Sequence, residues 1–360
     1  FFFPLKFLTY IYIYICHISK SWMEDDSIIY DDLDCDDIDT EGQKQESNDT
    51  TTTTSFSEIS GREITRDLIL RHCDRPTIPR GRKLSSHQMR DLEDKMLMKQ
   101  THLHLNGQGI GRIANLNHME SLEKLYLYDN VIARIEHLSK LKRLEYLYLN
   151  NNRITEISGL DSLTNLQKLY LQHNEIRFVT GLQNCSRLEE LNLSYQHLPE
   201  GEGLGFDPQS MASISYSLRT LLLSQCGISS AGVTQLYGLM QLRKLDLTSN
   251  EIDDFDAIES TLGPCQRLGS LVLRNNPITR MPKYRDNLII ALDGLNDLDG
   301  EDITEKQREF ILRFHLHKMK ASMPQQSVSS PPPERQPSPP LPPPPCLLPP
   351  LPPPPPPPPA

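Results

Sequence analysis

Leucine and isoleucine recur at fixed positions through the middle of the chain. Three consecutive 22-residue segments begin at Leu122, Leu144 and Leu166, and all three follow the pattern L-x-x-L-x-L-x-x-N-x-[IV]-x-x-[IV]-x-x-L. Isolated leucines recur by chance, but a constant period that also returns an asparagine does not. The pattern therefore predicts a tandem repeat in which each copy forms the same short structural unit.

Within each copy, the L-x-L pair predicts a short strand whose leucines point inward, and the later apolar positions turn inward on the return arm. One copy cannot enclose a core alone, so the array depends on the stacking of neighbours. The motif is the leucine-rich-repeat signature. The predicted fold class is α/β: a leucine-rich-repeat solenoid, or horseshoe, of about eight 22-residue-type repeats with helical caps and disordered tails.

The asparagine position extends the register in both directions. It is occupied in turn by Gln108, Asn130, Asn152, Asn174, Gln196, Cys226, Asn250 and Asn276, so the spacing is 22 four times and then 30, 24 and 26. A polar side chain that faces inward is expected to hydrogen-bond the backbone of adjacent turns, since a buried polar group without a partner is costly. We therefore predict a structural asparagine ladder of Asn130, Asn152, Asn174, Asn250 and Asn276.

The chain is expected to divide into five segments: acidic disorder in 1–60, an N-terminal helical cap in 61–100, repeats in 101–282, a C-terminal cap in 283–322 and a polyproline tail in 323–360. In the first cap we expect two helices. The second begins near Ser85 or Ser86 and covers the first core layer with Met89, Leu92, Met96 and Leu97. In the last cap we expect helices over Tyr284–Leu292 and about Thr304–Lys320, the latter packed through Phe310, Ile311 and Phe314.

The formal net charge of −10 has a local origin, because residues 24–41 hold ten carboxylates and no Lys or Arg. The remainder is close to neutral, which argues against a nucleic-acid partner. A calcium loop is rejected because Asp37 and Gln43 stand where glycine and glutamate are needed. Residues 1–22 are apolar, but the uncharged run from Phe7 to Ser19 is too short to span a bilayer. We interpret them as translated upstream sequence before Met23 and expect no membrane partner.

No catalytic constellation is found, and no cofactor or metal is expected. His102 and His104 could project from one strand face as a metal pair, but neighbouring copies offer no third ligand. The seven cysteines are scattered without a C-x-x-C pair, and Cys185 and Cys226 fall on core positions. This distribution favours a reducing cytosol over a disulfide-capped secreted protein. The sequence therefore predicts a binding protein rather than an enzyme.

The register identifies the expected binding face, because residues between the core leucines of each strand point to the concave side. Five tyrosines fall on adjacent strands there and predict an exposed aromatic patch of the composition found at interface hot spots. The alternative is that tyrosines simply suit strands and pack cross-strand. The candidate partner-binding residues are His104, Lys124, Tyr126, Tyr128, Tyr146, Tyr148, Lys168, Tyr170, Gln172, Asn192, Asp246 and Arg274.

Several stretches between Arg62 and about Phe314 carry a family resemblance: ITRDLILRHC, KLYLYDN, the LPEGEGLGFDPQSM insertion after the fifth copy, and NPI…KYRDNLI…LDG. They resemble the protein phosphatase 1 regulatory subunit 42 family, testis-type intracellular leucine-rich-repeat proteins. The resemblance implies a non-catalytic partner of the protein phosphatase 1 catalytic subunit, cytoplasmic and associated with microtubules and the centrosome, cilium or flagellum. Tubulin is then a further partner. Asp293 departs from the proline usual in such caps, and the [KR]-x-[VI]-x-[FW] docking motif is absent from the sequence.

Two alternatives remain open. The I-T-x-D-L-I opening also resembles leucine-rich-repeat assembly factors for axonemal dynein, although those usually continue into a β-sandwich domain. The proline-rich tail, with 21 prolines between Pro324 and Ala360, is expected to be polyproline II. Such a segment suits profilin or SH3-type aromatic grooves, which would make the protein an actin-linked adaptor.

Overall fold

The computed structural model describes residues 61–73 and 85–322, all within the compact unit Glu58–Ala360. These ranges contain the repeat array and its two caps. The expectations for the acidic segment, the rejected calcium loop, the apolar residues 1–22 and the proline-rich tail concern residues outside these ranges.

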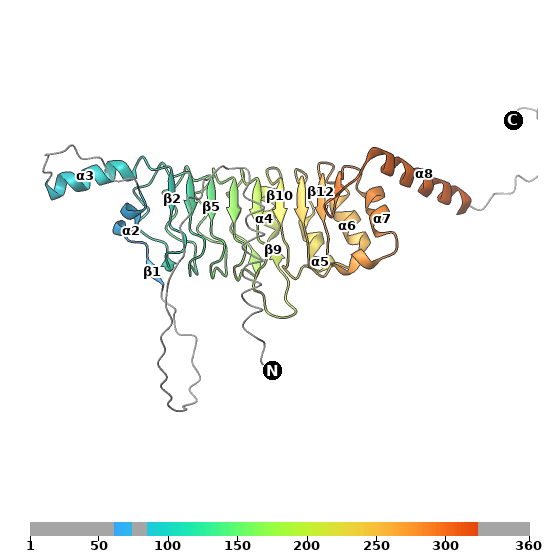
Figure 1. The fold of residues 1–360 in the computed structure, drawn as a ribbon, viewed down its shortest axis with the longest axis horizontal. Helices are drawn as coiled ribbons and strands as arrows, with labels where there is room; N and C mark the ends of the chain where they lie inside the picture. Colours follow the sequence, from blue (N-terminus) through green and yellow to red (C-terminus); the bar gives the residue numbers. More distant parts are fainter. Residues whose placement is uncertain (1–60, 74–84, 323–360) are drawn as a thin grey trace, which may run out of the picture. The chain divides into compact units, whose positions relative to one another are not determined.

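The repeats stack into one 10-stranded sheet with the order β14-β13-β12-β11-β10-β8-β6-β5-β4-β2. Every neighbouring pair is parallel except β13 and β14. Each of the eight repeats supplies one three-residue strand: β2 (His102–His104), β4 (Lys124–Tyr126), β5 (Tyr146–Tyr148), β6 (Lys168–Tyr170), β8 (Glu190–Asn192), β10 (Thr220–Leu222), β11 (Lys244–Asp246) and β12 (Ser270–Val272). The strands stand in a row in Figure 1. The predicted solenoid fold is confirmed.

The core is a continuous column of leucine and isoleucine layers. In the repeat of β4, Leu125, Leu127, Ile132, Ile135 and Leu138 are all at most 2% exposed. Because Leu125 pairs with Leu147 and Leu147 with Leu169, equivalent side chains lie directly above one another. Each buried leucine stabilises the fold by roughly 1.5–3 kcal/mol relative to an exposed one, and only the stack provides that burial.

The asparagine ladder joins each repeat to the one before it. The side chain of Asn152 accepts a hydrogen bond from Ile132 N at 2.9 Å and donates to Leu127 O and Leu149 O at 2.9 and 3.0 Å. Asn130, Asn174, Asn250 and Asn276 make equivalent contacts. Gln196 donates to Leu171 O at 2.9 Å in the same way. The ladder thus satisfies backbone groups that the turn leaves unpaired.

The residue immediately before each ladder position has a positive φ. The values lie between 51° and 67°, at Gly107, Asp129, Asn151, His173, Tyr195, Gln225, Ser249 and Asn275. This left-handed conformation costs a residue with a side chain about 1–2 kcal/mol, so asparagine, aspartate and glycine suit it best. Every repeat therefore has a residue in this strained conformation at the equivalent position of the turn that follows its strand.

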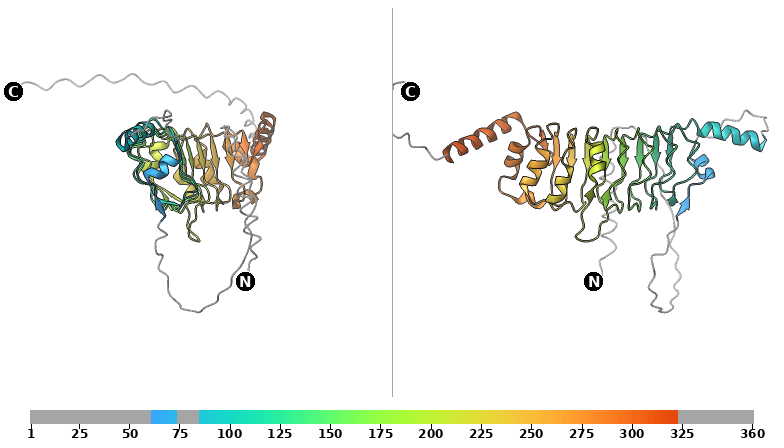
Figure 2. Two further views of the ribbon diagram at one scale, coloured as in Figure 1. Left: turned by 60° about the vertical axis from the view of Figure 1, so that its left-hand side comes forward. Right: turned by 180° about the vertical axis from the view of Figure 1, so that it is seen from behind.

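The irregular spacing of the later repeats has a structural cause. The first regular copies return through extended chain, whereas the longer copies form helices: α5 (Ser230–Val233) with η1 (Thr234–Leu236), and α6 (Phe255–Leu262). These helices lie on the side of the array opposite the strands (Figures 1 and 2). A helix rises only 1.5 Å per residue, so it takes more residues to cross the same layer.

The insertion after the fifth repeat folds against the array. Its strand β9 (Gly205–Phe206) pairs in parallel with β7 (Phe178–Val179), and α4 (Pro208–Ile214) follows at once. Asp207 accepts a 2.8 Å hydrogen bond from Ser210 N and so caps this helix. Phe206, Met211 and Ile214 are buried. The insertion is therefore part of the core.

At the N-terminal end, the structure corrects one expectation. The first core layer is covered mainly by β1 (Arg62–Glu63), which pairs with β3 (Ile110–Arg112), and by α2 (Arg66–Arg71). Ile64, Leu68, Ile69 and Cys73 are buried there. The expected cover, α3 (Ser86–Leu97), buries only Leu97, while Met89, Leu92 and Met96 are half-buried. The reason is position: residues 61–73 occupy the open end of the core, so α3 packs against that core only through Leu97 and, in part, Met96.

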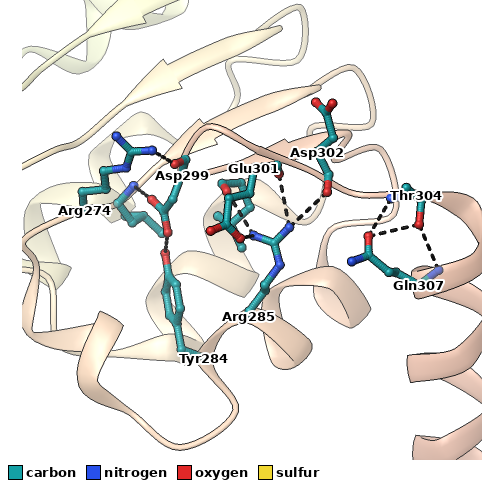
Figure 3. A network of polar contacts seen from close by, with 10 residues as sticks. Arg274, Tyr284, Arg285, Asp299, Glu301, Asp302, Thr304 and Gln307 are labelled. Carbon is teal, nitrogen blue, oxygen red and sulfur yellow. Dashed lines mark hydrogen bonds and ion pairs between the residues drawn. The ribbon is translucent and has the colours of Figure 1, made fainter.

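The C-terminal cap comprises η2 (Pro277–Arg280), α7 (Tyr284–Ala291), β13 (Asp297–Leu298), β14 (Glu301–Asp302) and α8 (Glu305–Ser322). Arg285 on α7 donates to Leu298 O at 3.1 Å and to Glu301 O and Asp302 O at 3.2 Å (Figure 3). Tyr284 donates to Asp299 at 2.9 Å in the same view. The expected packing of α8 is wrong in part, because Phe310 and Phe314 are 71% and 57% exposed.

Candidate partner-binding face

The outward-pointing residues of the eight repeat strands form one surface, which we call the strand face. Its central column runs His104, Tyr126, Tyr148, Tyr170, Asn192, Leu222, Asp246 and Val272, with each residue paired to the next across neighbouring strands. This order follows from repeat length, because a constant register places equivalent residues on one line. The face contains aromatic residues in its first four repeats only.

Four rings of this column stack on one another. The ring centroids of His104 and Tyr126 are 4.2 Å apart with planes 6° from parallel. Tyr126 and Tyr148 follow at 4.6 Å and 11°, and Tyr148 and Tyr170 at 4.7 Å and 5°. The two tyrosine–tyrosine distances are close to the spacing of neighbouring strands, so the sheet sets the stacking distance there. We call these four residues the aromatic row.

Stacking changes the expected exposure of the patch. Tyr126, Tyr128, Tyr146, Tyr148 and Tyr170 are all half-buried, so the expectation that they are exposed is wrong. The ring faces of the aromatic row cover one another, and its edges are what remains available. The cross-strand packing that we considered as an alternative is therefore present, and it shapes the surface that a partner would meet.

Beside the aromatic row, Tyr146 lies between two lysines. The ammonium groups of Lys124 and Lys168 are 4.9 and 5.6 Å from the centre of its ring. Cation–π contacts of this length are worth about 0.5–1 kcal/mol at a solvated site. The two cations and the ring thus form a compact cluster on adjacent strands β4, β5 and β6.

Glu190 on β8 joins the two columns. One of its oxygens accepts a 2.8 Å hydrogen bond from the Tyr170 hydroxyl, and the other lies 3.4 Å from Lys168 Nζ. Burial, followed by the neighbouring Glu190 carboxylate, raises the pKa of Tyr170 well above its usual range. Burial lowers the pKa of His104 at the other end, with His102 and His72 contributing. Both shifts favour the uncharged form of the residue at each end of the row.

The remaining candidates lie apart from this cluster or have local roles. Asn192 accepts a hydrogen bond from Ser194 N at 3.1 Å, and Asp246 accepts from Thr248 N at 2.9 Å. Arg274 donates to Asp299 O in the C-terminal cap. Gln172 is half-buried, and its Oε1 has no hydrogen-bond partner within the described residues. The structure thus brings together His104, Lys124, Tyr126, Tyr146, Tyr148, Lys168 and Tyr170.

One aromatic pair escaped the sequence reasoning. His173 stacks on Tyr195 with centroids 4.8 Å apart and planes 4° from parallel, on the turns that follow β6 and β8. Both residues occupy the left-handed turn position, with φ of 57° and 60°. Histidine adopts that conformation more readily than most residues, whereas the bulky tyrosine is poorly suited to it. Their occurrence at consecutive repeats was the signal in the sequence that could have identified the pair.

The described part of the chain contains neither a cluster suited to a metal ion nor a helix suited to a membrane. Within residues 61–73 and 85–322, no group of three or more His, Cys, Asp or Glu could hold a metal ion. None of the helices in these ranges is long and apolar enough to cross a membrane. Cys185, Cys226 and Cys265 are free and buried, and Cys73 is buried as well.

Comparison with known proteins is consistent with this geometry. Residues 120–162 match the model of the family described as "Leucine Rich repeats (2 copies)". The chain is similar to "Acidic leucine-rich nuclear phosphoprotein 32 family member A" of Drosophila melanogaster, 35% identical over 94 residues, which cover 25% of this chain and 34% of that protein. The same protein of Drosophila pseudoobscura pseudoobscura is 34% identical over 96 residues, with coverages of 26% and 35%. The chain thus spans about a third of the length of these curated relatives.

Among solved structures, an internalin C2 from Listeria monocytogenes str. 4b F2365 is 20% identical, with a TM-score of 0.41. The similarity covers 57% of this chain and 82% of that one. The family match falls on the repeats of β4 and β5, where the period of 22 and the asparagine ladder are most regular. Repeat sequence, stacked strands and family match together show that the chain is a leucine-rich-repeat protein.

Proposed function

We propose that this protein is a non-enzymatic scaffold that binds a protein partner through the first four repeats of its strand face. The observation that carries the proposal is the aromatic row beside the Lys124–Tyr146–Lys168 cluster. Tyrosine is enriched at binding hot spots because one side chain offers both apolar area and a polar group.

The site is held in place before any partner arrives. Each ring of the row stacks on its neighbour, and Glu190 fixes both Tyr170 and Lys168. Ordering a side chain at an interface costs about 0.5–1.5 kcal/mol, and a residue that is already ordered avoids most of that cost. A rigid row therefore favours binding even where its exposed area is modest.

We propose further that the partner is the protein phosphatase 1 catalytic subunit, with this chain acting as a regulatory or targeting subunit at microtubules or the centrosome. The support is the sequence resemblance over Arg62 to about Phe314, including the insertion that forms β9 and α4. On this proposal the protein is cytoplasmic and cytoskeleton-associated, at a centrosome, cilium or flagellum. Tubulin is a second partner under the same proposal.

The test is titration calorimetry of the full chain against the phosphatase catalytic subunit. The test variant replaces Tyr126, Tyr148 and Tyr170 with alanine. The matched control replaces Tyr216 and Tyr237, which are 82% and 64% exposed elsewhere on the array. A second variant, Lys124→Glu, reverses one charge beside Tyr146 without opening the row. Circular dichroism checks that every variant keeps its fold.

Micromolar or tighter binding that is lost in the triple variant, weakened in Lys124→Glu and kept in the control supports both parts of the proposal. Binding that survives in all variants refutes the strand face as the phosphatase site. No binding by the unaltered chain refutes the phosphatase proposal. Assembly of axonemal dynein would then be the next function to test, with the same variants.

A further inference from the structure

A groove lies between helices α7 and α8, and no residue of the strand face lines it. Its volume is about 250 Å³, and its lining includes Lys283, Ile290, Phe310, Ile311, Phe314 and His315. Sites for drug-sized molecules usually measure about 300–1,000 Å³ and bury most of their ligand. This groove is smaller and open, so it suits side chains of an extended peptide better than a small molecule.

The walls of the groove are fixed by polar contacts. Arg308 on α8 donates to Ile289 O at 2.9 Å, which ties α8 to α7. Arg285 on α7 holds the β14 segment that leads into α8, and Gln307 and Thr304 cap the start of α8 (Figure 3). Because both helices are anchored from several sides, the groove exists without a ligand.

The apolar wall of the groove is exposed to solvent. Phe310 and Phe314 are four residues apart, so they lie one above the other on the same side of α8. They are 71% and 57% exposed, although the core of the array buries nearly all of its large apolar side chains. Leaving two rings in water forgoes the stabilisation that burial would provide.

One lining residue of the groove, Lys283, brings a cation close to the apolar wall. The ammonium group of Lys283 is 5.3 Å from the centre of the Phe314 ring. Lys283 has φ of 60°, in the left-handed region that residues with side chains rarely adopt. An aromatic groove is the type of surface that recognises polyproline II segments.

We propose that this groove is a binding site for a proline-rich segment and that its occupant is this chain's own C-terminal segment, residues 341–360. That segment contains Leu341, Leu347, Leu348 and Leu351 among its prolines and carries no Asp, Glu, Lys or Arg. Its apolar composition matches the exposed phenylalanine wall. Proline-rich chains lose little conformational entropy when bound, because the bound form is already preferred in solution.

The length of the chain and its point of attachment favour an intramolecular contact. The segment 323–360 continues directly from α8, whose residues Phe310 and Phe314 line the groove. From Ser322 back to Phe314 the helix rises about 12 Å, at 1.5 Å per residue. A linker of 18 residues, the length of 323–340, can reach up to about 60 Å, so it can easily span this distance. A short linker also raises the effective concentration of the segment to the millimolar range.

The test places a nitroxide label next to the segment in the full chain and observes isoleucine methyl signals by NMR. The label is attached to Ser338→Cys, with Cys16, Cys35 and Cys346 changed to serine, because the four cysteines of the described residues are buried. The expected result is selective broadening of Ile290 and Ile311 signals, with no effect on Ile154 in the third repeat. Phe310→Ala/Phe314→Ala should abolish that broadening, as judged against the reduced label.

Leu316→Ala is the matched control, because Leu316 is 55% exposed on α8 but is not among the lining residues. It should leave the broadening unchanged. If the Ile290 and Ile311 signals of the protein with an unaltered groove are equally sharp with oxidised and with reduced label, the proposal is overturned. Broadening that also appears when labelled and observed chains are different molecules shows that a second copy supplies the segment, which overturns the intramolecular occupant.

Discussion

Tyr170 and Glu190 lie on adjacent strands and share a 2.8 Å hydrogen bond in which the tyrosine hydroxyl is the donor. The contact ends the aromatic row and fixes its last ring. Burial and the adjacent carboxylate both disfavour the tyrosinate, so the pKa of Tyr170 is raised far above its ordinary value of about 10. A group whose pKa is higher in the folded protein stabilises the fold below its unfolded pKa, and this stabilisation is lost as the pH rises.

The first prediction concerns Tyr170→Phe. At pH 8 the variant should be less stable by about 1–2 kcal/mol, because it loses a hydrogen bond to a charged acceptor. Above about pH 10 the difference should shrink, because only the unaltered protein must keep a tyrosine protonated on folding. Urea unfolding at pH 8 and about pH 11 measures both effects. Tyr216→Phe, at an 82% exposed position, should change neither value.

The second prediction concerns the ladder. Asn152→Leu should destabilise the array by about 2–3 kcal/mol, because Ile132 N loses its buried acceptor, and Leu127 O and Leu149 O each lose one of two amide donors. The greater hydrophobicity of leucine does not offset that loss. Asn117→Leu is the control, since Asn117 is exposed. Equal unfolding midpoints in urea for both variants would show that the ladder does not contribute.

A third prediction tests the left-handed turn at Gln225, whose φ is 51° and whose side chain is exposed. Gln225→Val should lower the free energy of unfolding by about 1–2 kcal/mol, because a branched side chain resists this conformation. Gln225→Gly should stay within about 1 kcal/mol of the unaltered protein, since relief of strain and greater freedom of the unfolded chain oppose each other. Thermal unfolding distinguishes the two. Equal losses of unfolding free energy in the two variants would show that side-chain contacts, and not φ, determine the stability of this turn.

The fourth prediction uses the buried thiols as reporters. Burial is the main cause that raises the pKa of Cys185 to about 11 and that of Cys226 to about 12. With Cys16, Cys35 and Cys346 changed to serine, the remaining cysteines should react with a thiol reagent at pH 8 only as the protein unfolds. The absorbance of the released product, followed against urea concentration, should coincide with the circular dichroism transition. Rapid reaction of Cys226 in the native protein would contradict this prediction.

The regular repeats were predictable because each position has one physical role. Leu125, Leu147 and Leu169 must point inward, so the residues between the leucines must point outward, and pattern alone assigns the column from His104 to Val272. Asn130, Asn152 and Asn174 were predictable for the same reason: a polar residue at an inward position needs backbone partners.

Features that depend on contacts between distant segments were not predictable in this way. The stacking of Tyr126 on Tyr148 needs ring orientations as well as register. The pairing of Phe178–Val179 with Gly205–Phe206 joins a repeat to the insertion, and the inserted segment carries no periodic signal. On α8, an apolar spacing predicted packing for Phe310 and Phe314, but spacing does not show whether another element covers a helix face.

Strand β14 has a consequence for assembly. It runs antiparallel to β13 and ends the sheet with Glu301 and Asp302, both exposed. A stack of identical parallel strands would otherwise present, at its last edge, a template onto which the first strand of another molecule could add. Reversed direction and two carboxylates make that edge a poor match for β2, and charged edges discourage such pairing. The cap therefore opposes head-to-tail polymerisation, a hazard inherent to any protein built by repetition.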